Sequence, residues 1–309
     1  MANAPFPIDP VLTGIAIAYS NSRLIADQVM PRVMVGKQEF KYWKYKLEDG
    51  FTVPDTKVGR RSAPNQIEFD ATEETESTED YGLDDPIPQA DIDNAPENHD
   101  PRGRSTEQLT NLILLDREVR VANMVFNAAN YAAGNKQVLS GTSQFSDFTA
   151  SDPIGVIMDS LDSMVMRANK MTIGRPAYSV LARHPDIVKA AHGNSGDKGV
   201  ATRQAIADLF ELEEVIVGEA WINTARKGQA PSIQRAWGKH IALQYIDPQA
   251  DNRNGTTHAF TAQWGGRIAG SIEDKDIGLR GGERVRAGES VKEIIAANDL
   301  AYLIENAVA

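Results

Sequence analysis

The chain has 309 residues, 41% of them hydrophobic, which is enough to bury one elaborate core or two lobes of ordinary size. It contains no cysteine, which excludes disulfides, thiolate nucleophiles and cysteine-based zinc sites. Its 43 acidic and 32 basic residues give a net charge of -11, which disfavours general affinity for nucleic acid or an anionic membrane. The sequence has no apolar run near the ~20 residues of a membrane span and no secretory pattern, so we expect a cytosolic protein.

The first 36 residues are rich in proline and small apolar residues, which predicts an N-terminal arm. Its prolines confine any helix to the stretch between about Leu12 and Val29. A strand is predicted next, over Gln38–Leu47, because aromatic residues alternate there with lysines at a period close to two.

The segment from Glu48 to Pro101 shows no lasting helical period, which predicts long loop structure. Charge is segregated around it: Arg32–Arg61 holds eight basic and four acidic residues, whereas Gln66–Asp100 holds thirteen acidic and no basic ones. Two solvated arms without a partner would explain this pattern. However, a loop of this length is usually ordered by contact with something else, and we expect contact with neighbouring copies of the chain. The candidate contact residues are Lys41, Trp43, Lys57, Arg60, Arg61, Glu73, Glu74 and Glu76.

A long helix is predicted from about Ser105 to Ala133. Ser105 and Gln108 form a capping-box pattern at its start, and Gly134-Asn135 supplies a C-terminal stop. At ~1.5 Å per residue the helix would be about 40 Å long, which makes it a strut. Its expected apolar stripe consists of Leu112, Leu115, Val119, Ala122, Phe126 and Ala129, with Asp116, Arg117 and Arg120 among the polar positions.

The rest of the chain mixes helical and strand patterns. Asp152-Pro153 opens a second helix, which is expected to end before Gly174. Shorter helices are expected over 184–191 and 202–210. Strands are expected over 177–181, 214–217, 241–246, 257–264 and 284–286, with 291–295 leading to a last strand at 302–304. This irregular succession predicts an α+β fold with mixed sheets and no βαβ repeat.

The sequence lacks the common catalytic patterns. The glycines at 193–199 and 265–266 do not have the spacing of a phosphate loop or a dinucleotide fingerprint, and turns explain them. The five histidines lack metal-binding spacing, and neither Ser195 nor Ser290 lies in a nucleophile elbow. The aromatic residues of Lys41–Lys46 could stack on single-stranded nucleic acid, but an amphipathic strand explains them more simply. We therefore expect no enzyme, cofactor or metal site. An enzyme built on the glycine-rich loops is the alternative.

The order of these elements resembles the Hong Kong 97 type capsid fold. The shared order is a flexible arm, a strand leading into a long charged loop, a long capped helix, a second helix, an α+β lobe and terminal strands. Several segments are also similar to the major capsid proteins of lambda-like and Mu-like tailed phages. These segments are Tyr81–Pro88, Leu114–Arg120, Ala182–Ile187, Ala207–Phe210, Val215–Gly218 and Asp299–Val308.

This resemblance implies an organisation into five parts. They are an N-terminal arm at 1–36, an extended loop and its base at 37–81, a peripheral domain at 82–144 that includes the spine helix at 105–133, an axial domain at 145–282, and C-terminal strands at 283–309 that return to the body. The extended loop would lie across an adjacent subunit. The axial domains would gather at the centres of pentamers and hexamers.

The implied function is structural: self-assembly into the icosahedral head of a phage around double-stranded DNA, which the wall would contact only non-specifically. The implied partners are other copies of the chain, a separate scaffolding protein, a portal and, where one exists, a decoration protein, with no membrane. The implied location is the virion capsid, after assembly in the bacterial cytoplasm. Lys57 is the nearest candidate for a covalent crosslink, although nothing identifies an asparagine partner. An encapsulin-like shell around cargo enzymes is the alternative.

Overall fold

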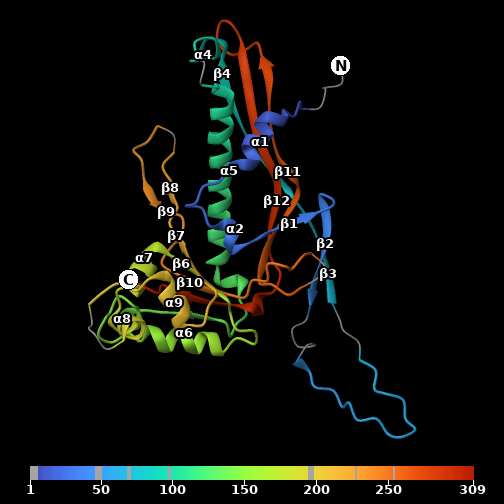
Figure 1. Ribbon diagram of the computed structural model, residues 1–309, viewed down its shortest axis with the longest axis vertical. Coiled ribbons are helices and arrows are strands. Elements are labelled where there is room, and N and C mark those ends of the chain that lie inside the picture. The colour runs from blue at the N-terminus through green and yellow to red at the C-terminus, as the bar shows by residue number, and fades with distance from the viewer. Residues whose placement is uncertain are drawn as a thin grey trace.

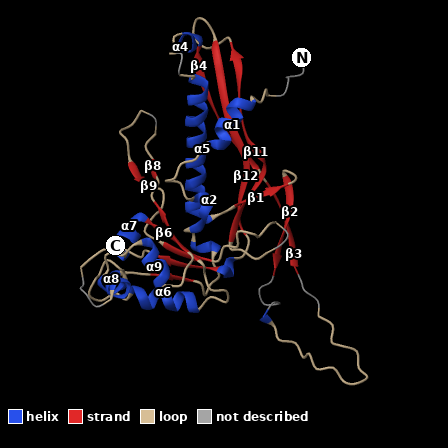
Figure 2. Cartoon of the chain, in the orientation of Figure 1, coloured by secondary structure: helices blue, strands red, loops and turns tan. Residues whose placement is uncertain are grey.

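The computed structural model describes residues 6–45, 51–67, 71–96, 99–193, 198–226, 228–252 and 255–309. An elongated body carries a rounded lobe at one end and a hairpin that projects from its side (Figure 1). Figure 2 shows one long helix running beside the strands of the body and short helices gathered around the lobe. The predicted α+β class is confirmed.

The N-terminal arm contains two short helices, which fall within the predicted stretch except that the first begins two residues earlier, at Pro10. Helix α1 (Pro10–Ala18) begins after Asp9, whose carboxylate accepts hydrogen bonds from the amides of Val11 and Leu12. Helix α2 (Ala26–Val29) follows. The buried face of α1 packs against the body, where Leu12 and Ala16 join a core cluster. The arm is therefore fastened to the body along much of its length.

The body sheet has four strands in the order β1-β11-β12-β4. Their bounds are Arg32–Val35 for β1, Glu79–Pro88 for β4, Ala259–Asp274 for β11 and Gly282–Ile295 for β12. Strand β1 is parallel to β11, and the other neighbours are antiparallel. A register shift interrupts the pairing of β11 between Trp264 and Ile268. The long β11–β12 ribbon gives the body its length (Figure 1).

The prediction of loop structure from 48 to 101 is wrong for its second half. Strand β3 (Ala71–Ser77) pairs antiparallel with β2 (Glu39–Tyr45), and β4 pairs with β12. The acidic residues that suggested a solvated loop instead face basic residues of the partner strands: Asp84 binds Arg286, and Glu79 binds Lys292 at 2.7 Å. A short helix, α4 (Gln89–Asp93), follows β4.

The long helix α5 spans Pro101–Val125, so the predicted bounds of 105 and 133 are both too late in the chain. Asp100 caps its start by accepting a hydrogen bond from the amide of Arg102, and Pro101 occupies the first turn. Ser105 is a buried helical residue that donates to Asp85, so it is not the cap. After Val125 the chain forms a 3-10 turn, η1 (Ala128–Asn130).

The predicted apolar stripe of the helix is also wrong. Leu112 is 50% exposed, whereas Leu109, Ile113, Val121 and Val125 are buried. The helix contacts α1, α2, β4 and β12, so it is covered on more than one side and a single stripe cannot describe its burial. Its buried surface includes charged side chains, described below.

The lobe contains a second sheet of five strands in the order β5-β13-β10-β6-β7. Their bounds are Lys136–Val138 for β5, Lys170–Gly174 for β6, Glu214–Gly218 for β7, Ile241–Gln244 for β10 and Ala301–Glu305 for β13. The helices of the lobe are α6 (Pro153–Asp162), α7 (Arg175–Leu181), α8 (Pro185–His192) and α9 (Arg203–Leu209). Short 3-10 turns, η2 (Gly141–Ser143) and η3 (Asn298–Leu300), complete this part of the fold.

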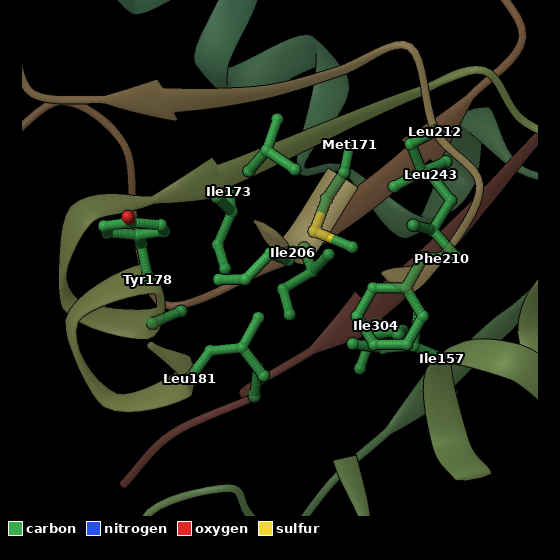
Figure 3. Packing of buried hydrophobic residues seen from close by; sticks show 14 of the residues in the cluster. Ile157, Met171, Ile173, Tyr178, Leu181, Ile206, Phe210, Leu212, Leu243 and Ile304 are labelled. Carbon is green, nitrogen blue, oxygen red and sulfur yellow. The ribbon is translucent and has the colours of Figure 1, made fainter. Parts of the chain in front are cut away.

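A large apolar core holds the lobe together. Side chains of the sheet, such as Met171 and Leu243, meet Ile157 of α6, Leu181 of α7 and Ile206 of α9 (Figure 3). These five residues are fully buried. Each buried side chain of this size contributes about 1.5–3 kcal/mol, so the helices and the sheet depend on one another.

One prediction for the lobe is corrected. The segment 177–181 belongs to helix α7 and is not a strand, because Pro176 starts a helix directly after the edge of β6. The helix that begins at Pro153 ends at Asp162, well before Gly174. Strand β6 occupies the last five residues of the segment between these two positions. The shorter helices at 184–191 and 202–210 and the strand at 214–217 are confirmed within a few residues.

Another hairpin, β8 (Trp221–Asn223) with β9 (Ile233–Arg235), projects from the lobe (Figure 1). The implied domain boundaries stay predictions. Strand β11, which falls wholly in the range 145–282 given to the axial domain, lies in the body sheet.

Candidate subunit interface

The β2–β3 hairpin carries five of the eight predicted contact residues. The Lys41 ammonium lies 2.9 Å from a Glu73 carboxylate oxygen, and Lys44 lies 3.7 Å from Glu74. Lys41 and Glu73 are both substantially exposed, and such surface pairs contribute only about 0–1 kcal/mol. The basic and acidic segments therefore meet within one chain, along the antiparallel register of the two strands. Trp43 and Glu76 also lie on these strands, where Trp43 is 40% exposed.

Packing on one face fixes the base of this hairpin. Phe40 and Tyr42 are buried against β11, where the Tyr42 ring meets Phe260 edge-on at 6.2 Å between centroids. The Tyr42 hydroxyl donates to Glu74 at 2.6 Å, and burial together with this carboxylate raises the pKa of Tyr42. The Asn252 side-chain amide donates to the Lys41 carbonyl, and the Asn252 backbone carbonyl accepts from the Trp43 amide. The alternation of aromatic residues and lysines in the sequence thus corresponds to a strand with one buried face and one solvent-exposed face. Residues 46 and 47 of that predicted strand lie outside the described residues.

The remaining predicted contacts, Lys57, Arg60 and Arg61, lie in the loop of residues 51–67, and all three are exposed. This loop extends well away from the body (Figure 1). It also exposes large apolar side chains, with Val53 92% exposed. Among the described residues, none of the three basic side chains makes an ion pair. The loop therefore presents positive charge and apolar surface with little support from its own chain.

A groove of about 460 Å³ lies where the register of β11 shifts. Its lining includes Trp264, Ile268 and Ala287, with the carboxylates of Asp80 and Glu289 beside them. Trp264 and Ile268 are 42% and 38% exposed, and Gly265 has a φ of 68°, which lets the strand bulge. The lining also includes Arg286, and the Glu289 carboxylate is buried against Arg32 and Arg267, so the body carries a mainly apolar depression with Asp80 as its exposed acidic residue.

Buried charges join the N-terminal arm to the long helix. Glu118 is fully buried and accepts hydrogen bonds from the amides of Ile25 and Ala26 and from the Trp237 indole, the last at 2.6 Å. Burial raises the pKa of Glu118, and these donors and Arg117 partly offset that effect. A single carboxylate therefore links α5 to the arm and to the lobe.

Arg117 next to it is 1% exposed and donates to Asp27 at 2.6 Å and to the Met30 carbonyl. Arg32 of β1 binds the buried Glu289 at 2.9 Å. Burial opposes ionisation of Glu289, but Arg32 and Arg267 outweigh it and lower the pKa. The helical pattern of the sequence predicted Arg117 on the polar face of the helix, and it did not predict this network. The sequence carries only a weak sign of this network, which is that the charged residues Arg117 and Glu118 lie between the apolar residues Leu114 and Val121.

One arrangement in the lobe resembles a catalytic triad but cannot act as one. The Ser151 hydroxyl lies 3.1 Å from His184 Nε2, and Asp186 lies 3.6 Å from Nδ1. The amide of Asp186 donates to Nδ1, so Nε2 carries the proton and faces the serine as a donor. The hydroxyl itself donates to the Asp147 carbonyl. Because Nε2 has no free lone pair, the histidine cannot accept a proton from Ser151.

Ser195 lies outside the described residues, and Ser290 donates to Asp80 on the body sheet. Within the described ranges no cluster of histidine, aspartate and glutamate could hold a metal ion. In the same part of the chain no helix is both long and apolar enough to cross a membrane.

An arm fastened to a long helix, a hairpin loop that projects from the body and a separate α+β lobe define a subunit of the Hong Kong 97 type capsid fold. No family model matches the sequence. The chain is 61% identical over its full length, and over the full length of the relative, to the major capsid protein of Pseudomonas phage JBD67. It is 31% identical to the major capsid protein of Burkholderia phage BcepMu, over 96% of this chain and 95% of the relative. The chain therefore belongs to the family of phage major capsid proteins that includes these two relatives.

Solved structures show the same fold. A phage-related protein from Bordetella bronchiseptica is similar with a TM-score of 0.75 and 22% identity, over 98% of each chain. A virus-like particle from Pyrococcus furiosus is similar with a TM-score of 0.57 and 11% identity, over 96% of this chain and 97% of that one. Neither curated relative is an encapsulin, so the cargo-shell alternative finds no support among them. The chain is a structural protein of a phage capsid.

Proposed function

We propose that copies of this chain form pentamers and hexamers, which close into an icosahedral head around double-stranded DNA. One observation carries the proposal: the loop 51–67 holds exposed apolar and basic side chains far from the body of its own chain (Figure 1). A subunit of a shell must present surface to several copies, and arms provide area that a compact body does not. Family membership supports the same conclusion.

The eight predicted contact residues would act between subunits in this assembly. Lys57, Arg60 and Arg61 would be carried by the loop onto a neighbour. Lys41, Trp43 and Glu73 would line the exposed face of its base, and the half-buried Glu74 and Glu76 would make contacts from the rim of the face that carries Tyr42 and Phe40. We propose the groove beside Trp264 as the acceptor for the loop of a neighbouring copy. Its apolar floor suits side chains such as Val53, and the exposed carboxylate of Asp80 at its edge suits a basic residue of the loop.

The remaining parts of the proposal rest on the resemblance to tailed-phage capsid proteins. A scaffolding protein, a portal and, where one exists, a decoration protein would be the partners, and assembly would take place in the bacterial cytoplasm. The net charge of -11 suits a wall that contacts DNA only non-specifically. The chain would have no turnover of its own.

Sedimentation velocity and negative-stain electron microscopy of the purified chain test this proposal. We expect rings or closed shells at high protein concentration. Reversing the charge of the loop with Lys57→Glu, Arg60→Glu and Arg61→Glu together should reduce assembly. Arg183→Glu is a single-site control for charge reversal, because among the described residues this exposed guanidinium donates to the Ser179 carbonyl alone. A wild-type chain that stays monomeric, or a triple variant that assembles like the control, would contradict the proposal.

A further inference from the structure

The β8–β9 hairpin presents two large apolar side chains, Trp221 and Ile233, on a face that its own chain covers only in part. Trp221 pairs with Arg235 and Asn223 pairs with Ile233, so these four side chains share one face of the two strands. Trp221 is 51% exposed and Ile233 is 57% exposed. A two-stranded hairpin is marginally stable when nothing covers it. Exposed large side chains on such an element indicate a contact surface.

The same hairpin is basic in an acidic protein. Residues 221–235 contain three basic residues and no acidic one. Arg235 lies over the Trp221 ring, with its guanidinium carbon 3.8 Å from the ring centroid, and donates to the Glu219 carbonyl. Arg226 is exposed near the tip. Neither arginine forms an ion pair with a carboxylate among the described residues. The hairpin therefore offers positive charge beside an apolar face.

The opposite side of the lobe carries the complementary surface. Residues 208–214 hold four acidic residues and no basic one. Glu211 is 78% exposed on its side chain, and Asp162 at the end of α6 is 64% exposed. Arg167 contacts both carboxylates, so they lie together, and the nearby Val165 is 58% exposed. An exposed apolar side chain thus stands beside two exposed carboxylates that share one arginine, which leaves a net negative charge at this surface.

The two surfaces cannot meet within one chain. Figure 1 shows the hairpin projecting upward from the lobe, whereas α6 runs along its lower side. Surfaces that match in charge and lie on opposite sides of a subunit suit a head-to-tail contact between copies, and such contacts close into rings when the rotation permits.

We propose that the β8–β9 hairpin of one copy docks on the surface formed by Asp162, Val165 and Glu211 of the next copy around a ring. Trp221 and Ile233 would cover Val165, while Arg226 would lie against Glu211. This inference rests on the proposed function, since it assigns a contact within the rings of that assembly. It does not involve the loop 51–67.

A charge swap tests the contact directly. Arg226→Glu alone and Glu211→Arg alone should each raise the protein concentration needed for half-maximal ring formation by about fivefold to thirtyfold. Each substitution removes an attraction and adds a repulsion at every contact of the ring. The double variant Arg226→Glu with Glu211→Arg should restore assembly to near the wild-type concentration. Arg183→Glu again serves as the control, and circular dichroism should show the same fold for all variants.

The outcomes separate this inference from the proposed function. A wild-type chain that forms rings together with an Arg226→Glu variant that forms them equally well would overturn the docking contact and leave the proposed function intact. A double variant that assembles no better than the single variants would overturn the pairing of these residues. A wild-type chain that never forms rings would refute the proposed function and this contact with it.

Discussion

Replacing Glu118 with glutamine should weaken the attachment of the N-terminal arm. Both carboxylate oxygens of Glu118 accept hydrogen bonds from buried N–H groups. Glutamine keeps one acceptor oxygen and turns an NH2 group, itself a donor, toward the other N–H groups. At least one hydrogen bond to a charged acceptor is lost, which costs about 1.5–3 kcal/mol, and a buried N–H is left without a partner. We expect Glu118→Gln to lower the free energy of unfolding by about 2–4 kcal/mol.

Urea unfolding followed by tryptophan fluorescence measures this loss, because Trp237 itself donates to Glu118. Trypsin should also cleave faster after the exposed Arg23, two residues before the tethered amide of Ile25. Glu107→Gln on the exposed face of the same helix is the control and should change stability by less than about 0.5 kcal/mol. A Glu118→Gln variant with wild-type stability and wild-type cleavage would refute the assigned role of this carboxylate.

Three further predictions concern the interior. Arg117→Met should destabilise the chain by about 3–5 kcal/mol, measured in the same urea assay, because it removes the partner of a largely buried ion network. Gly174→Ala should destabilise the folded chain by at least about 1–3 kcal/mol, because the new Cβ would lie 1.8 Å from the Gly238 carbonyl oxygen. Gly134→Ala is the control, because a Cβ at that position would have no other heavy atom within 4 Å. Burial lowers the pKa of His258 from 6.5 to about 4. Between pH 6.5 and pH 4 this histidine is therefore protonated in the unfolded chain but neutral in the folded chain. Stability should therefore fall by about 2 kcal/mol from this group between pH 7 and 5, and His258→Phe should lose that part of the slope. Equal slopes in the two proteins would rule the assignment out.

Local patterns predicted many elements correctly. The alternation of aromatic residues and lysines located β2, because its buried face and wet face differ in every second residue. His184-Pro185 located the start of α8, where the histidine side chain caps the helix. The helix α5 was found but its ends were misplaced, because Ser105 with Gln108 imitates a cap while Asp100-Pro101 is the real one. These are signals that lie within a few residues of the element they specify.

Features that depend on distant partners could not be predicted in this way. Glu118 binds residues 92 to 119 positions away in the chain, so its burial leaves no local trace. The acidic residues of β4 suggested a solvated loop because their partners, such as Arg286, follow some 200 residues later. The β8–β9 hairpin was missed because its strands are only three residues long, too short for an alternating pattern to show.

A cryo-EM reconstruction of the assembled particle tests the central claim, which is that this protein acts through contacts between its copies. It should show the loop 51–67 of one copy lying on a neighbour, with Lys57, Arg60 and Arg61 against acidic side chains, and the β8–β9 hairpins directed at the next copy within each ring. A particle in which both hairpins stand free in solvent, with only compact bodies touching, would contradict the account.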